Sequence, residues 1–170
     1  MVLVRRKLRR VREEQDRAPG RGSRSAAPGH LPQTDARLMT VFDIEVAKRF
    51  KDLDPYDHVS NATFLDYVME ARVRVYRALG MYAREVVGQV VVRQEINYLR
   101  PIRFSIEPLQ TRTWFSHIGT SSFTMETQLI DEGQLAADAK SVMVCFDKDS
   151  STSRPIPPEF RLLIEEHLEN

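Results

Sequence analysis

The chain has 170 residues, of which 42% are hydrophobic and 29% are charged, and its formal net charge is +1. This length fits one globular domain that can bury about 70% of its unfolded surface, and the composition excludes a wholly disordered chain. Because no apolar run approaches the roughly 20 residues of a membrane-spanning helix, we expect a soluble protein with no membrane partner. The single cysteine, Cys145, excludes an intramolecular disulfide and fits a protein of the reducing cytoplasm. No Cys/His cluster has the spacing of zinc ligands, so we expect no bound metal.

The charge is distributed unevenly along the chain. Residues 1–37 hold ten of the 25 Lys/Arg and four of the 24 Asp/Glu, which makes this segment +6 and the remainder −5. A nucleic-acid-binding domain needs basic residues on its folded surface to neutralise phosphates. The acidic body therefore argues against nucleic acid as a partner.

Residues 1–38 form a basic extension rich in Arg, Gly, Pro, Ser and Ala. This composition predicts disorder and separates the extension from one domain over residues 39–170. A transit peptide is an alternative, but the three acids among residues 13–16 count against it because such peptides avoid acids. Translation that starts at Met39, directly before the first predicted strand, is another alternative.

The domain opens with a strand pattern, in which Phe42, Ile44 and Val46 alternate with polar neighbours. A polar stretch over residues 51–60 follows and contains a proline, which predicts a loop. Apolar residues then recur at spacings of three and four and predict a helix of about 20 residues. The members of this stripe are Phe64, Leu65, Val68, Ala71, Val75 and Leu79, with Ser60 or Asn61 to cap the helix and Gly80 to end it.

Four strand candidates and a short terminal helix complete the chain. The strands are expected at about residues 88–99, 104–116, 119–131 and 134–147, and the helix at about 158–168. Pro108 interrupts the second of these strands and indicates a bulge or a sheet edge there. These four strands suggest an antiparallel meander, and the order strand, long helix, four strands predicts an α+β protein. Its five-stranded antiparallel sheet wraps around the helix, which is the hotdog arrangement. Its exposed edges favour pairing with a second copy.

The loop before the long helix carries the candidate chemistry. Asp52, Asp54 and Asp57 lie beside His58, and a helix start directs unsatisfied N–H groups towards such a loop, where they can hold an oxyanion. Alternatively, these residues have no catalytic role: the three aspartates are solvent-exposed loop acids, and His58 is an ordinary loop histidine. Other catalytic sequence motifs are absent: there is no G-x-S-x-G nucleophile elbow, no H-E-x-x-H zinc motif and no glycine-rich phosphate loop. Cys145 lies in an apolar strand pattern, which favours core packing over a role as nucleophile.

The segment from Asp52 to Arg72, DLDPYDHVSNATFLDY followed by EAR, resembles the signature of 4-hydroxybenzoyl-CoA thioesterase-like hotdog proteins. It is most similar to the branch of single-domain acyl-CoA thioesterases that includes long-chain acyl-CoA hydrolases. Looser similarities at QEINYLRPI (residues 94–102) and GTSSF (residues 119–123) follow in the family's order. Asp57 departs from the pattern where glycine is frequent, and Ser60 departs where the first asparagine is usual.

The resemblance implies roles for individual residues. Asp54 matches the catalytic aspartate, which activates water or attacks the thioester directly, and the backbone N–H of Asn61 matches the group that polarises the carbonyl. His58 is the further catalytic candidate of the motif. No metal or organic cofactor is implied. Residues Phe64, Tyr67 and Val68 are expected either to line the acyl site or to belong to the core, and Arg100, Arg103, Ser121 and Ser122 are expected to meet the CoA phosphates at a dimer seam.

The sequence thus predicts a cytoplasmic acyl-CoA thioesterase of lipid metabolism, acting as a homodimer or homotetramer. An acyl-carrier-protein thioesterase is a second interpretation, which the acidic body disfavours because that partner is itself acidic. A non-catalytic hotdog dimer that binds acyl-CoA is the third. Acyl length and type, pathway and the exact role of Asp54 are left open.

Overall fold

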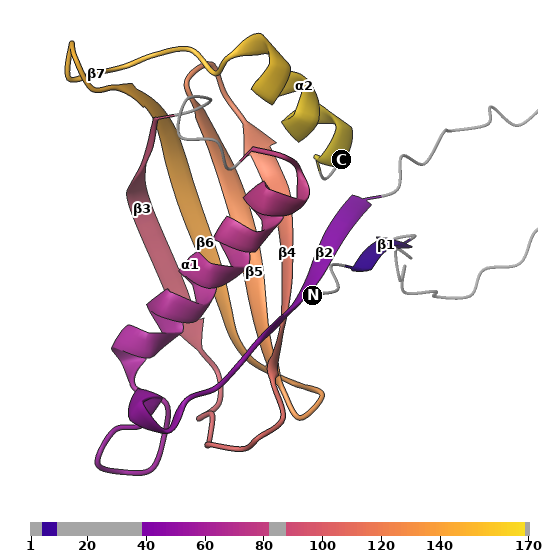
Figure 1. The fold of residues 1–170 in the computed structure, drawn as a ribbon, viewed down its shortest axis with the longest axis vertical. Helices are drawn as coiled ribbons and strands as arrows, with labels where there is room; N and C mark the ends of the chain where they lie inside the picture. The colour runs from indigo at the N-terminus through magenta and orange to yellow at the C-terminus, as the bar shows by residue number, and fades with distance from the viewer. Residues whose placement is uncertain (1–4, 10–38, 82–87, 169–170) are drawn as a thin grey trace, which may run out of the picture.

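The computed structural model describes residues 5–9, 39–81 and 88–168, with the backbone alone for residues 5–9 and 39. Figure 1 shows the order of its elements. These are β1 (Arg5–Arg9), β2 (Met39–Val46), the 3-10 turn η1 (Phe50–Asp52), α1 (Asn61–Ala78), β3 (Gln89–Tyr98), β4 (Leu109–Ile118), β5 (Ser122–Asp131), β6 (Gln134–Asp147), β7 (Thr152–Ser153) and α2 (Pro158–His167).

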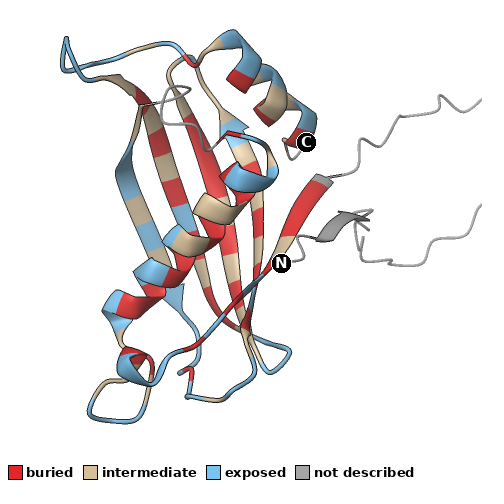
Figure 2. Ribbon diagram, viewed as in Figure 1, coloured by how far each residue is buried: buried red, intermediate tan, exposed pale blue. Residues whose placement is uncertain are grey.

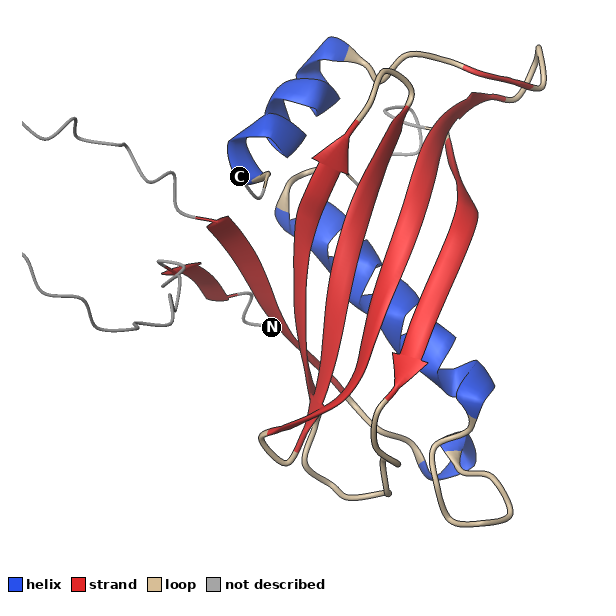
Figure 3. Ribbon diagram, turned by 180° about the vertical axis from the view of Figure 1, so that it is seen from behind, coloured by secondary structure: helices blue, strands red, loops and turns tan. Residues whose placement is uncertain are grey.

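One antiparallel sheet forms the body of the domain. Its strand order is β1-β2-β4-β5-β6-β3, with the short β7 beside β6. The five long strands wrap around α1, which lies across one face of the sheet, while the view from behind shows the other face without a helix on it (Figures 1 and 3). This architecture confirms the α+β class and the hotdog arrangement.

Two expectations about the strands are wrong. The four later strands do not form a consecutive meander, because β3 lies at the edge and pairs with β6, while β4 pairs with β2 and β5. Hydrophobic alternation identifies a strand but carries no information about its neighbours. In addition, β4 begins at Leu109 rather than near residue 104, so Pro108 precedes the strand instead of interrupting it. A proline lacks the N–H that a ladder needs, which explains this boundary.

The core lies between α1 and the inner face of the sheet. Alternate residues of the inner strands are buried there, as are Phe64, Tyr67, Val68 and Val75 of α1 (Figure 2). Leu65 is an exception to the predicted stripe, since it is exposed on the outer side of the helix. Burial of large apolar side chains at about 1.5–3 kcal/mol each is what holds the helix on the sheet.

The helix begins and ends where the sequence predicts. The Oγ of Ser60 accepts a hydrogen bond from the N–H of Thr63 at 3.3 Å, so Ser60 is the N-cap. Gly80, just past the other end, has a φ of +70°, a left-handed conformation that costs glycine little.

The first strand lies within the extension for which the composition predicts disorder. Residues Arg5–Arg9 pair antiparallel with β2, from Arg5 opposite Asp43 to Arg9 opposite Met39. The remainder of the extension lies outside the described residues. The domain boundary at residue 39 stays a prediction, although β2 begins at that residue.

Two long connections project at the end of the molecule where α1 begins. One runs from β2 to α1 and the other from β3 to β4, whereas α2 lies at the opposite end (Figure 1). Within the described segments, no helix is both long and apolar enough to cross a bilayer.

Candidate active site

A short ladder fixes the loop that leads into α1. The N–H of Asp54 donates to the carbonyl of His58 at 2.7 Å, Leu53 forms a bridge with Val59, and the N–H of Ser60 donates to the carbonyl of Asp52 at 2.9 Å. A second contact joins this loop to the connection after β3, because the N–H of Val59 donates to the carbonyl of Ile102 at 2.8 Å. The candidate residues are therefore held on a fixed backbone.

The carboxylate of Asp54 closes the tip of this loop. Its Oδ1 accepts hydrogen bonds from the N–H groups of Tyr56 at 2.8 Å and His58 at 3.2 Å. Among the described residues its Oδ2 accepts none, and the side chain is only partly buried. Asp54 thus has one oxygen engaged in shaping the loop and one oxygen available to water or a substrate.

Asp57 occupies the turn at the tip of the same loop. Its φ is +60°, in the left-handed region that favours glycine. The structure thereby gives a physical reason for the frequent glycine at the matching position of the hotdog signature. An aspartate tolerates this conformation better than most residues do.

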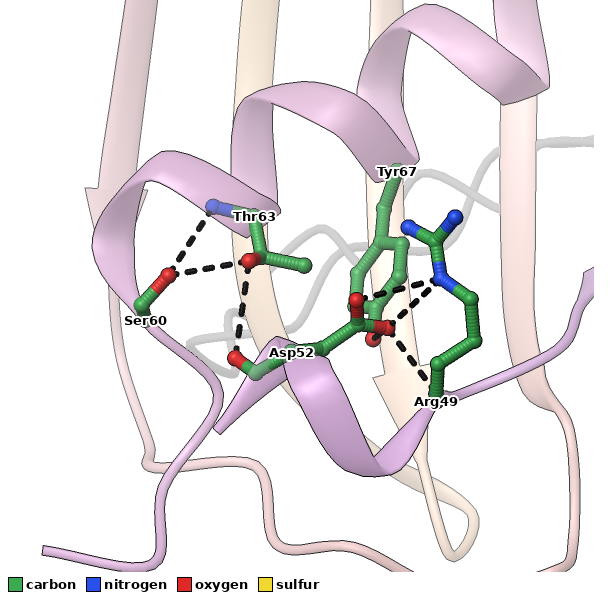
Figure 4. A network of polar contacts seen from close by, with 5 residues as sticks. All are labelled: Arg49, Asp52, Ser60, Thr63 and Tyr67. Carbon is green, nitrogen blue, oxygen red and sulfur yellow. Dashed lines mark hydrogen bonds and ion pairs between the residues drawn. The ribbon is translucent and has the colours of Figure 1, made fainter. Parts of the chain in front are cut away.

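Asp52 is buried and anchors the loop to the helix (Figure 4). Its Oδ2 accepts from the hydroxyl of Tyr67 at 2.8 Å and from the N–H of Arg49 at 2.9 Å, and its Oδ1 lies 3.1 Å from Nε of Arg49. Its backbone carbonyl also accepts from the Oγ1 of Thr63 at 3.4 Å. One residue therefore joins the turn η1 to the first two turns of α1.

Electrostatics keeps this carboxyl ionised. Burial alone would raise the pKa of Asp52, but hydrogen bonds from Tyr67 and Arg49 and the charge of the guanidinium outweigh it and lower the pKa below its usual range. Burial, together with the adjacent carboxylate, raises the pKa of the Tyr67 hydroxyl. The phenol consequently keeps its proton and remains a donor.

The start of α1 offers free donors beside the loop. Within the described parts of the chain, the backbone N–H groups of Asn61 and Ala62 donate to no protein acceptor, as is usual for the first turn of a helix. The carbonyl of Asn61 accepts from the hydroxyl of Tyr98 at 3.4 Å. No hydrogen bond joins the carboxylate of Asp54 to these N–H groups, so their joint action on a thioester remains a prediction.

His58 lies beside the acid but is engaged through its backbone. Its N–H donates to Asp54, and its main chain forms a bridge with Arg103. The imidazole makes no hydrogen bond with any residue of the described ranges. Its predicted catalytic role is therefore neither supported nor opposed by a contact.

The predicted phosphate contacts fall at two ends of the molecule. Arg100 and Arg103 line one cavity of about 270 Å³ beside the β5–β6 turn, and their guanidinium groups make no ion pair with the described residues. Ser121 and Ser122 lie at the β4–β5 turn, at the opposite ends of the strands. Within one copy, the serines and the arginines are not brought together.

The predicted acyl-site residues Phe64, Tyr67 and Val68 are all buried. Phe64 packs edge to face on Tyr98 with the ring centroids 5.1 Å apart. Tyr67 also lines a hollow of about 430 Å³ between α1 and the chain that leaves β2. All three side chains therefore belong to the hydrophobic core, as one of the two expectations has it. Their role in lining an acyl site stays a prediction.

Two features of the site were not predicted from the sequence. One is the anchoring role of Asp52, and the other is an ion pair of 2.5 Å between Lys48 and Asp131, in which the lysine side chain is almost fully buried. The spacing of Arg49 and Asp52 is a local signal for the first. No local pattern predicts the second, because Asp131 is the last residue of β5 and lies 83 positions after Lys48.

Two further side chains, Glu70 and Cys145, have structural explanations. Glu70 pairs with Arg74 at 2.6 Å, as the helix spacing predicts, and Cys145 is buried, which raises the pKa of its thiol. Across residues 39–81 and 88–168, no three His, Cys, Asp or Glu side chains are grouped to hold a metal ion.

Two features are typical of hotdog thioesterase-like proteins. One is an antiparallel sheet wrapped around a single helix, and the other is an acidic loop hydrogen-bonded to the start of that helix. The chain belongs to the thioesterase-like superfamily, whose family profile matches residues 48–163. It is 30% identical over 130 residues to the long-chain acyl-CoA thioesterase FadM of Escherichia coli (strain K12), a match that covers 72% of this chain and 96% of FadM.

Solved structures agree with this assignment. A thioesterase from Thermus thermophilus, crystallised in complex with coenzyme A and Zn, is 32% identical and superposes with a TM-score of 0.65 over 74% of this chain and 93% of that one. A thioesterase-superfamily protein from Jannaschia sp. CCS1 has a TM-score of 0.71 at 22% identity, over 83% and 99% of the two chains, and supports the fold.

Proposed function

We propose that this chain hydrolyses acyl-CoA thioesters to CoA and a free fatty or other carboxylic acid. The observation that carries the proposal is the Asp54 carboxylate. One of its oxygens accepts hydrogen bonds from two backbone N–H groups, and the other accepts none from the described residues. Similarity to a long-chain acyl-CoA thioesterase and to a thioesterase that binds coenzyme A supports the substrate class.

The proposed chemistry needs only this carboxylate and the start of α1. Asp54 removes a proton from water as the water oxygen bonds to the carbonyl carbon, and the N–H of Asn61 donates to the oxyanion that forms. The C–S bond then breaks and the proton passes to the departing CoA sulfur, with His58 as a second candidate for that transfer. Direct attack by Asp54 would give an anhydride that water then cleaves, and both routes yield the same products.

The proposed assembly brings the separated phosphate contacts together. β3 is a sheet edge on which Val90, Val91 and Val92 are all exposed, although valine favours buried strands. If two copies pair along β3 about a two-fold axis, the strands run antiparallel. The β4–β5 turn of one copy then faces the end that carries Arg100 and Arg103 in the other, and one CoA could meet both.

The functional proposal is tested by release of free CoA from acyl-CoAs of two to eighteen carbons, compared with acyl groups on an acyl carrier protein. We expect turnover of acyl-CoA and a defined optimum of chain length. Tight binding of acyl-CoA without any turnover would instead identify a non-catalytic binding protein, and turnover confined to the carrier protein would identify an acyl-carrier-protein thioesterase. A cytoplasmic location and a place in lipid metabolism accompany the proposal as predictions.

A further inference from the structure

The side chain of Tyr98 contacts the first turn of α1 in two ways. Tyr98 is the last residue of β3, and this strand ends at the end of the molecule where α1 begins (Figure 1). Its ring packs edge to face on Phe64 with the centroids 5.1 Å apart, and its hydroxyl donates to the carbonyl of Asn61 at 3.4 Å. Tyr98 therefore joins the edge of the sheet to the helix start.

These contacts lie beside the two backbone N–H groups, those of Asn61 and Ala62, that have no acceptor among the described residues. The carbonyl of Asn61 belongs to the same peptide group as the N–H of Ala62. A hydrogen bond accepted by a carbonyl polarises its peptide group, which strengthens the N–H of that group as a donor. The hydroxyl of Tyr98 thus acts through one peptide group on one of the two free donors.

The first turn of α1 is supported from two sides. On the side of the loop, the carbonyl of Asp52 accepts from the N–H of Ser60 at 2.9 Å and from the Oγ1 of Thr63 at 3.4 Å. On the side of the sheet, Tyr98 holds the turn, and aromatic pairs in this geometry attract each other beyond the effect of burial. The loop support belongs to the connection that carries Asp54, so the two supports together set the position of the free donors relative to that carboxylate.

We propose that Tyr98 is a positioning residue for hydrolysis, which holds the first turn of α1 so that its free N–H groups meet the oxyanion of the thioester. This inference rests on the proposed function and extends it to a sheet residue to which the sequence similarity assigns no role. Tyr98 is 49% exposed, and Asn61 and Ala62 are exposed as well, so a substrate can reach the donors without displacing the ring. Charge on the carbonyl oxygen develops only in the transition state, so loss of this support lowers kcat more than it changes KM.

The test compares Tyr98→Phe with the matched control Tyr76→Phe in the full chain. Each change removes one hydroxyl that joins α1 and β3, but the hydroxyl of Tyr76 bonds to Gln89, at the opposite end of the strand, at 2.9 Å. For one acyl-CoA, Tyr98→Phe should lower kcat at least threefold with KM within twofold, and Tyr98→Leu, which also removes the ring contact, should lower kcat at least tenfold. Tyr76→Phe should leave kcat within 1.5-fold of the unaltered chain, although it loses the shorter hydrogen bond.

An infrared measurement reports on the donors themselves. An acyl-CoA analogue with a CH2 group in place of the sulfur is a ketone that cannot be hydrolysed, and the stretching frequency of its carbonyl falls as hydrogen bonds to the oxygen strengthen. The carbonyl band of the bound analogue should lie at a higher frequency in Tyr98→Phe than in the unaltered chain, and it should not move in Tyr76→Phe.

The inference is overturned if the analogue does not bind, if Tyr98→Phe leaves the band in place, or if both variants shift the band equally. A fall in kcat without a shift of the band would show a merely structural role for Tyr98 and would overturn the inference too. A chain that binds the analogue, shows the predicted shift and releases no CoA from acyl-CoA would contradict the proposed hydrolysis alone. The two proposals can therefore fail separately.

Discussion

Asp52 shows how a buried carboxylate can be retained at little cost. Removing it from water is unfavourable, but Tyr67, the N–H of Arg49 and its guanidinium supply partners for both oxygens. Arg49 itself is half exposed, so its charge is screened and contributes less than the buried hydrogen bonds do. The stabilising effect therefore resides mainly in the contacts to Tyr67 and to the backbone.

Replacing Asp52 with Asn should lower the free energy of unfolding by about 1–3 kcal/mol, because a charged acceptor becomes neutral and one of its oxygens is lost. Urea unfolding at neutral pH measures the change. Tyr67→Phe should destabilise the chain by a similar amount, and the two changes combined should cost less than their sum because they share one hydrogen bond. Fully additive effects would show that the contact is not formed.

The same carboxyl predicts a pH dependence. Its pKa is lower in the folded chain than in the unfolded chain, so its contribution to stability is present above the unfolded value of about 3.9 and is lost as the pH falls towards the folded value. Between pH 5 and pH 3, the free energy of unfolding should therefore fall less for Asp52→Asn than for the unaltered chain. Urea unfolding at each pH measures it. Parallel losses in the two proteins would contradict this assignment.

The left-handed conformation of Asp57 gives a prediction about the tip of the loop. Asp57→Gly should change stability by less than about 0.5 kcal/mol, since relief of the backbone conformation is offset by greater freedom of the unfolded chain. Asp57→Val should cost about 1–2 kcal/mol, because a β-branched residue fits a φ of +60° poorly. Thermal unfolding of both variants measures these changes. Equal midpoints for the valine and glycine variants would show that the loop relaxes and does not require the left-handed conformation.

At the scale of elements, α1 depends on its N-cap. Ser60→Ala should destabilise the chain by about 1 kcal/mol, because the N–H of Thr63 loses a side-chain acceptor, whereas Ser60→Asn should be nearly neutral. Circular dichroism during thermal unfolding provides the measurement. If alanine and asparagine lowered the midpoint equally, capping would not be the function of this side chain.

The elements themselves can be predicted from the sequence far better than their arrangement. The stripe from Phe64 to Val75 and the cap at Ser60 are local signals, and they place α1 to within a residue. The position of β3 beside β6 depends on long-range pairing that no local pattern encodes. In the same way the motif indicates Asp54, and spacing indicates the pair of Asp52 with Arg49, but the bond from Tyr67 to Asp52 joins residues fifteen positions apart on different elements and could not be inferred.

At the scale of the whole molecule, the exposed edge of β3 should join two copies. Val92→Glu introduces a charge at a 57% exposed position of that edge and should shift the chain from dimer to monomer in analytical ultracentrifugation. Leu162→Glu on α2 is the matched control and should leave the dimer intact. An unchanged mass for Val92→Glu, or dissociation by both variants, would place the interface elsewhere.

The proposed hydrolysis depends on one particular carboxylate of the loop before α1, that of Asp54. The direct measurement is kcat/KM for release of CoA from one long-chain acyl-CoA by Asp54→Asn and by Asp57→Asn, two isosteric changes on the same loop. We predict a loss of at least 100-fold for Asp54→Asn and a change within threefold for Asp57→Asn, with both variants folded by circular dichroism. Equal rates for Asp54→Asn and the unaltered chain would contradict the assignment.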